Sequence, residues 1–160
     1  MKNNLPDGGR RFWIMPLILS FLALTPKCYS EEVSLKINLL NLDKPGILYF
    51  SICKDVGAFK RTVENESEED SCRGAVVETE LKDVFEIRAE VPDGEYAIAA
   101  FLDINANNKM DKNFIGIPKE QYGFSNNAMG RMSAPSFDQA KFSVEGDTIH
   151  DIALRSGIPK

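Results

Sequence analysis

The feature that most constrains the fold of this chain is an alternation of apolar and polar residues with a period of two. Val33, Leu35, Ile37 and Leu39 carry the first instance, which ends at a turn signal in residues 43–46. Successive side chains of a β-strand point to opposite faces, so the pattern predicts strands rather than amphipathic helices. Further strands are predicted at residues 47–53, 75–81, 84–91, 95–102, 141–144 and 148–154.

About seven short antiparallel strands separated by turns are typical of an all-β fold with two packed sheets, a β-sandwich. Residues 95–102 are the strongest candidate for its centre, because apolar residues occupy both faces of that strand. We therefore expect both faces of residues 95–102 to be covered.

The first thirty residues differ from the rest. Lys2, Arg10 and Arg11 precede an apolar run at residues 12–25, and Cys28 and Ser30 are small residues at minus three and minus one of a cleavage point before residue 31. This layout predicts a cleaved signal peptide at residues 1–30 and one mature domain at residues 31–160. The apolar run is too short for a membrane anchor. We expect an extracytoplasmic protein, periplasmic or secreted from a bacterium, with no membrane span after cleavage.

Cleavage would move the formal net charge from −5 to −8. An acidic chain with no basic stripe repels nucleic-acid phosphates, so nucleic acid is not an expected partner. Cys53 and Cys72 are the cysteines that remain, and an oxidising compartment favours a disulfide between them. The intervening acidic stretch at residues 55–74 is expected to form a solvated loop or a short helix.

The segment from residue 103 to residue 140 has no strand pattern and is longer than most loops in compact domains. Its apolar residues, Phe114 among them, and its glycines and prolines predict an ordered loop that packs over one end of the sandwich. Long ordered loops on a rigid scaffold are where binding residues gather. We therefore place the candidate functional residues in this loop.

The start of this loop resembles the spacing of a calcium-binding loop. Oxygen-bearing side chains stand at relative positions one, three, five and nine, but position twelve is Phe114, so only the later Glu120 can supply the missing acidic ligand. The candidate calcium ligands are Asp103, Asn105, Asn107, Asp111 and Glu120. The alternative is that these side chains cap their own backbone in successive Asx turns.

A second set of residues in the loop combines aromatic rings with amides and a hydroxyl, as surfaces that bind a glycan or a peptide do. The candidate binding residues are Tyr122, Phe124, Ser125, Asn126 and Asn127. The alternative for these residues is self-packing that extends the core.

Four motifs in order, at residues 92–97, 103–111, 116–127 and 135–137, resemble the bacterial secreted family called domain of unknown function 2141. The resemblance covers residues 33–154 and implies no activity, because the family has no assigned function. Members often carry a His where this chain has Leu102, so no role for that imidazole is implied here. The turn at residues 92–97 also resembles transthyretin-like and carboxypeptidase-regulatory-like sandwiches, which bears on fold alone.

The sequence contains few of the groups that catalysis usually requires. The one histidine, His150, falls at strand period with Ile152 and Leu154, and no nucleophile or metal-hydrolase motif is present. We expect a non-catalytic binding or accessory module, with calcium as its candidate ion and an unknown glycan, peptide or envelope protein as its partner. The alternatives are a purely structural envelope domain and a calcium-dependent hydrolase of glycans, which would need Asp103, Asp111 and Glu120 to converge in an open pocket.

Overall fold

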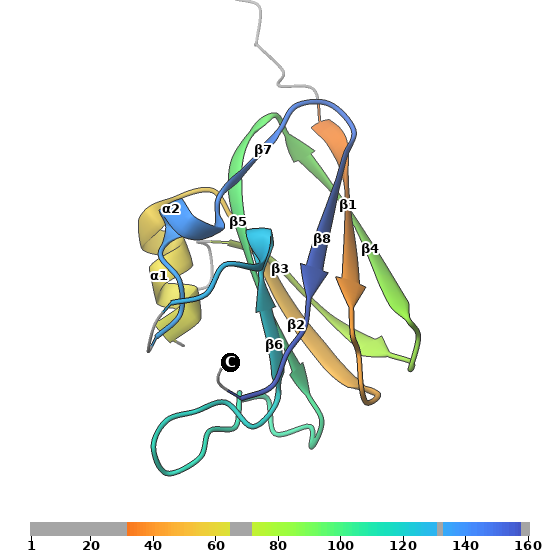
Figure 1. The fold of residues 1–160 in the computed structure, drawn as a ribbon. Helices are drawn as coiled ribbons and strands as arrows, with labels where there is room; N and C mark the ends of the chain where they lie inside the picture. Colours follow the sequence, from red (N-terminus) through yellow and green to blue (C-terminus); the bar gives the residue numbers. More distant parts are fainter. Residues whose placement is uncertain (1–31, 65–71, 131–132, 158–160) are drawn as a thin grey trace, which may run out of the picture.

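The computed structural model describes residues 32–64, 72–130 and 133–157, which form two packed β-sheets with short helices on one side (Figure 1). The predicted signal peptide at residues 1–30 lies outside the described residues. In chain order the strands are β1 (Glu32–Leu40), β2 (Gly46–Cys53), β3 (Cys72–Thr79), β4 (Val84–Pro92), β5 (Gly94–Asp103), β6 (Gln121–Phe124), β7 (Phe142–Val144) and β8 (Thr148–Ala153). The helical elements are α1 (Val56–Glu64), the 3-10 turn η1 (Ser125–Asn127) and α2 (Phe137–Ala140).

The strands form a smaller sheet in the order β4-β1-β8 and a larger sheet in the order β3-β2-β5-β6, with β7 paired to the start of β5. Apolar side chains from both sheets meet in one core, which includes Leu35 of β1, Leu48 of β2 and Ile98 of β5. The predicted all-β sandwich is therefore confirmed. No helix among the described residues is long and apolar enough to cross a membrane.

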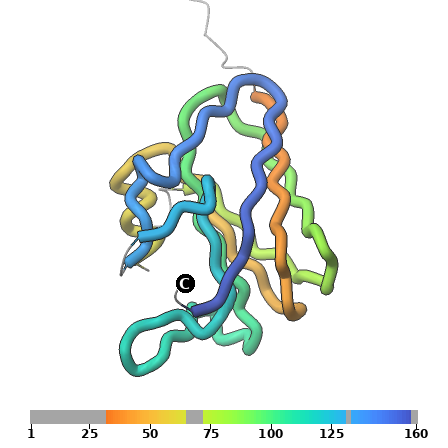
Figure 2. The backbone as a smooth tube through the Cα atoms, viewed as in Figure 1, coloured from red at the N-terminus to blue at the C-terminus, as the bar shows by residue number. Residues whose placement is uncertain are grey.

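One pairing departs from the predicted antiparallel arrangement. Strands β1 and β8 run parallel, with Leu35 opposite Thr148, and Figure 2 shows these orange and blue segments side by side. Parallel neighbours need a long crossover connection, and here the chain passes through the larger sheet between β4 and β8. Alternation within a strand carries no information on its direction, so the sequence pattern could not reveal this pairing.

Both faces of β5 are covered, as predicted. One face joins the core between the sheets and the other joins a second buried cluster beneath the helices. Phe59 of α1 and Phe137 of α2 belong to that cluster, with their ring centroids 6.0 Å apart in an edge-on arrangement. The residues of β5 that face the inner core are Tyr96, Ile98, Ala100 and Leu102.

The predicted disulfide joins Cys53 at the end of β2 to Cys72 at the start of β3, two residues that lie opposite each other in the sheet. The segment between the two cysteines contains α1, so the short helix that was one of the two predictions for residues 55–74 is present. Asp55 immediately precedes the helix and caps its N-terminus, because its carboxylate accepts a hydrogen bond from the backbone N–H of Ala58 at 2.8 Å. Most of the acidic run, at residues 65–71, lies outside the described residues.

The segment from residue 103 to residue 140 is less irregular than predicted. It contains β6, which adds an eighth strand, followed by η1 and α2. All four residues of β6 are buried, so no alternation marks it in the sequence. Its Gly123 passes so close to β8 that an added Cβ would lie 2.8 Å from the Ile152 side chain. The glycine that reads as a turn signal is therefore a close-packing position within a strand.

Candidate functional site: a cleft on the outer face of the larger sheet

The loop that follows β5 is built around a buried carboxylate. Asp103 is fully buried, and its Oδ1 accepts backbone N–H groups of Asn105 and Asn107 at 3.2 and 3.3 Å. Its Oδ2 accepts the N–H of Asn108 at 2.7 Å. Asn108 adopts the left-handed conformation, with φ of 62°, which asparagine tolerates better than most residues. The Asp103 carboxylate thus fixes the backbone of this turn through three hydrogen bonds.

Glu120 closes the same loop from its other end. This side chain is only 2% exposed, and its two oxygens accept the N–H groups of Ile104 and Asp111 at 3.0 and 2.9 Å. Both ends of the loop are therefore tied to one carboxylate, although residues 104 and 120 are far apart in the chain. This fixes where residues 112–118 leave the body of the molecule.

The remaining candidate ligands are also brought into this loop and bond to one another. Asn105 and Asn107 donate their side-chain amides to the two oxygens of Asp111 at 2.8 and 3.0 Å. Their Oδ1 atoms accept the N–H groups of Asn107 and Lys109. These are the contacts of the Asx-turn alternative. Among the described residues, no group of three or more His, Cys, Asp or Glu side chains is gathered closely enough to hold a metal ion.

The five predicted binding residues divide into two groups. Tyr122 and Phe124 of β6 belong to the cluster on the outer face of the larger sheet. Ser125 is instead fully buried, where its hydroxyl accepts the N–H of Ile98 at 2.8 Å and donates to the carbonyl of Ala140 at 2.6 Å. Ser125 therefore joins β5 to the end of α2.

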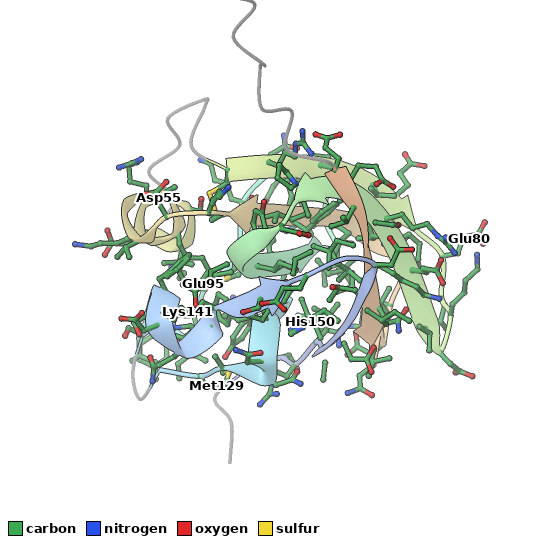
Figure 3. The ribbon with its side chains drawn as sticks, turned by 90° about the horizontal axis from the view of Figure 1, so that it is seen from above. Asp55, Glu80, Glu95, Met129, Lys141 and His150 are labelled. Carbon is green, nitrogen blue, oxygen red and sulfur yellow. A yellow bond between two sulfur atoms is a disulfide. The ribbon has the colours of Figure 1, made fainter. Side chains whose placement is uncertain are left out.

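Asn126 and Asn127 also serve internal contacts. Asn126 donates its side-chain amide to the carbonyl of Lys141 at 2.7 Å, and its backbone N–H donates to Nε2 of His150 at 3.0 Å. Asn127 accepts the N–H of Ala153 at 2.8 Å. Figure 3 labels Lys141, which lies between α2 and β7, and His150 of β8, the two residues that Asn126 contacts. The amide-rich turn η1 thus connects β6 to β7 and β8.

A large cleft lies on the outer face of the larger sheet, where Figure 1 shows α1, α2 and the teal loop at the lower left on one side of the strands. Its volume is about 1090 Å³, slightly above the range of about 300–1,000 Å³ for small-molecule sites. Tyr49 of β2 and Phe101 of β5 contribute to it as a stacked pair, with centroids 4.8 Å apart and planes inclined by 5°. The predicted residues Tyr122 and Phe124 line it as well.

The cleft is predominantly apolar, with a few charges. Met110, Ile117 and Met129 line it from the loops that flank the sheet. The charged lining residues are Lys60, Glu64 and Lys112. No salt bridge reaches Lys60 or Lys112 from any part of the chain that the structure describes, and both lysines are exposed. Their ammonium groups are therefore available to an anionic group at the cleft.

Sequence reasoning missed the contributions of α1 and β2 to this cleft. Tyr49 and Phe101 occupy adjacent strands at register-paired positions, a relation that single-strand alternation does not encode. The available signal was the apolar character of both faces of β2 and β5, which shows that something must pack on, or bind to, the outer face.

Together, these features define a two-sheet β-sandwich with a ligand-sized cleft beside an ordered polar loop. Residues 37–151 match the family model described as "Uncharacterized protein conserved in bacteria (DUF2141)", and the chain belongs to this family. The resemblance predicted from the four motifs is thus confirmed. No curated protein and no solved structure matches the chain.

Proposed function

We propose that this protein is a non-catalytic, extracytoplasmic binding protein that takes an anionic amphiphile with an acyl chain into the cleft. The observation that carries the proposal is the cleft itself, about 1090 Å³ in volume, with aromatic and aliphatic side chains as most of its lining. Removing apolar ligand surface from water into such a site is favourable by about 25 cal/mol per Å².

The lining favours an acyl chain over the glycan considered from the sequence. Sugar binding needs several polar groups that converge on hydroxyls, whereas Met110, Met129 and Ile117 offer flexible or aliphatic contacts. Lys60 and Lys112 supply positive charge for a carboxylate or phosphate head group. An apolar peptide with an acidic end has similar chemistry and is the second ligand to be tested.

Two observations support the non-catalytic and extracytoplasmic parts of the proposal. His150 accepts a hydrogen bond within the fold, and both Cys53 and Cys72 are in a disulfide, so neither group is free to act as a base or nucleophile. The disulfide together with the signal-peptide layout favours an oxidising compartment. The hydrolase alternative lacks support, because Asp103 and Glu120 are buried and lie outside the cleft lining.

Calcium enters the proposal through the loop that forms one wall of the cleft. Asp103, Asn105, Asn107, Asp111 and Glu120 supply oxygen atoms of the type that calcium prefers. An ion there would take the place of N–H donors that these oxygens now use. The purely structural alternative is the case in which neither calcium nor an amphiphile binds.

Displacement of a fluorescent fatty acid tests the proposal. A dansyl-labelled undecanoic acid should bind and be displaced by palmitate, and Ala99→Phe should weaken binding at least about tenfold because its ring occupies part of the cleft against β5. Ala75→Phe makes the same change on exposed β3 outside the cleft lining and should leave affinity unchanged. Lys60→Glu should weaken palmitate more than an uncharged alcohol of equal length. Equal affinities in the two phenylalanine variants would contradict the proposal.

A further inference from the structure

The turn at residues 112–118 presents two apolar side chains to water. Phe114 is 98% exposed and Ile115 is 63% exposed. Phe114 was expected to pack within its loop and is instead exposed. The segment at residues 112–118 belongs to the teal loop that projects from the body of the molecule at the lower left of Figure 1. Neighbouring exposed apolar side chains on an ordered projection indicate an interaction surface.

This turn is held in one conformation without help from a partner. The side-chain oxygen of Asn113 accepts the N–H groups of Ile115 and Ile117 at 3.0 and 2.9 Å, and the N–H of Asn113 donates to the carbonyl of Ile117 at 2.8 Å. Lys112 and Pro118 pair across the base of the turn. Binding through the tip therefore costs little ordering entropy.

The exposed charge around the turn has the opposite sign to that of the whole chain. Lys109, Lys112 and Lys119 are exposed, and no salt bridge reaches them within the described residues. The carboxylates of Asp103 and Glu120 are buried and bonded to backbone N–H groups, which leaves only Asp111 partly exposed. The exposed charged side chains around the turn are therefore mainly basic, while Asp103, Asp111 and Glu120 balance the three lysines in formal charge.

We propose that this turn inserts Phe114 and Ile115 into the surface of an anionic phospholipid bilayer. The apolar tip matches the boundary between head groups and acyl chains, and the surrounding ammonium groups match the lipid phosphates. The acidic body is repelled by the same surface, which orients the turn toward the bilayer. A protein partner would need a pocket shaped for Phe114, whereas a bilayer accepts the tip without one.

A single tryptophan reports on insertion. The chain's one Trp is Trp13, inside the predicted signal peptide, so Phe114→Trp in the processed protein carries a unique fluorophore at the tip. Its emission should shift to shorter wavelength, and brominated lipid should quench it, with vesicles of phosphatidylcholine plus phosphatidylglycerol. Leu81→Trp is the matched control, because Leu81 is 62% exposed in the β3–β4 turn. An equal shift in both variants, or none in the Phe114 variant, would overturn the proposal.

Vesicle co-sedimentation separates the contribution of Phe114 to membrane binding from that of the lysines. Phe114→Ala should weaken binding about tenfold, and Lys109→Glu with Lys119→Glu should weaken it at least about fivefold per site. Leu81→Ala and Lys82→Glu are the controls and should have no effect. All variants are prepared identically, so any retained leader is common to them. Tip-dependent capture of an envelope protein without vesicle binding would overturn the proposal.

Failure of membrane docking and failure of the cleft function are distinguishable. Ala99→Phe should weaken fatty-acid binding at least about tenfold and leave vesicle binding intact, because Ala99 lines the cleft on β5. Phe114, Lys109 and Lys119 do not line the cleft, and their variants leave Ile115 and Lys112, which do line it, unchanged. The Phe114 and lysine variants should show the converse. Loss of vesicle binding in Ala99→Phe would mean that cleft ligation of lipid, rather than tip insertion, holds the protein on the vesicle.

Discussion

His150 shows how a single residue in this fold becomes sensitive to pH. Its ring stacks on Phe142 with centroids 3.9 Å apart, and its Nε2 accepts the N–H of Asn126. Burial lowers the pKa of His150 from its usual value, and the nearby Asp151 carboxylate opposes this only in part. The folded state therefore favours the neutral ring more than the unfolded chain does. This agrees with the structural role expected for His150 from its strand spacing.

The first prediction concerns this histidine. In the unfolded chain the pKa of a histidine is about 6.5. As the pH falls, the imidazole is therefore protonated in the unfolded state before it is protonated in the folded state. The stabilising contribution is complete above that pH and is lost as the pH falls through the lower pKa of the folded state. Urea denaturation at pH values from about 8 down to about 5 should show this loss. His150→Gln should reduce the dependence of the free energy of unfolding on pH. The same dependence on pH in both proteins would contradict the role assigned to His150.

At the scale of elements, the disulfide joins β2 to β3 beneath α1. Both sulfurs lie beside the Thr62 hydroxyl of that helix, at 3.2 Å for Cys72 and 3.7 Å for Cys53. The second prediction is that Cys53→Ala with Cys72→Ala lowers the free energy of unfolding by about 3 kcal/mol, as expected from the entropy of a loop of this length. Reduced wild-type protein is the control and should have the same free energy of unfolding as the double variant. Denaturation unchanged by reduction would contradict the prediction.

The loop at residues 103–120 carries the third prediction. If calcium occupies this loop, calcium should raise the melting temperature relative to excess chelator, because a ligand that binds only the folded state stabilises it. Asp111→Asn keeps a side chain of the same shape and should remove the rise, whereas Asp83→Asn, at an exposed turn, should retain it. Identical melts with calcium and chelator would leave the Asx turns as the complete account of these residues.

The sequence predicted those elements whose signal is local. Alternation marked β1 and β4, apolar residues on both faces marked β5, and cysteine count predicted the disulfide. The four buried residues of β6 and the one-turn helix α2 gave no periodic signal, because each is shorter than the pattern needed to detect it. The loop carboxylates lie in one hydrogen-bonded loop, and their role as calcium ligands stays a prediction. The cleft was not predicted, because residues distant in sequence form its walls.

At the scale of the whole molecule, the two faces of the larger sheet have different roles. The inner face packs against β1, β4 and β8 in the sandwich core, whereas the outer face supports the cleft between α1, the loop at residues 110–118 and the segment leading into α2. Outer-face variants at cleft positions should therefore change binding with little change in stability. Core variants such as Ile98→Ala should cost about 2–5 kcal/mol of stability, measured by urea denaturation.

Photo-crosslinking with a diazirine-bearing palmitate, followed by mass spectrometry of the labelled peptides, shows directly where a fatty acid binds. Labels are expected on peptides that contain Phe101, Met110 or Met129, which line the cleft from three segments. Excess palmitate should suppress these labels, and so should Ala99→Phe. Labels that concentrate around Leu81, or that persist undiminished in Ala99→Phe, would contradict the assignment of the cleft as the binding site.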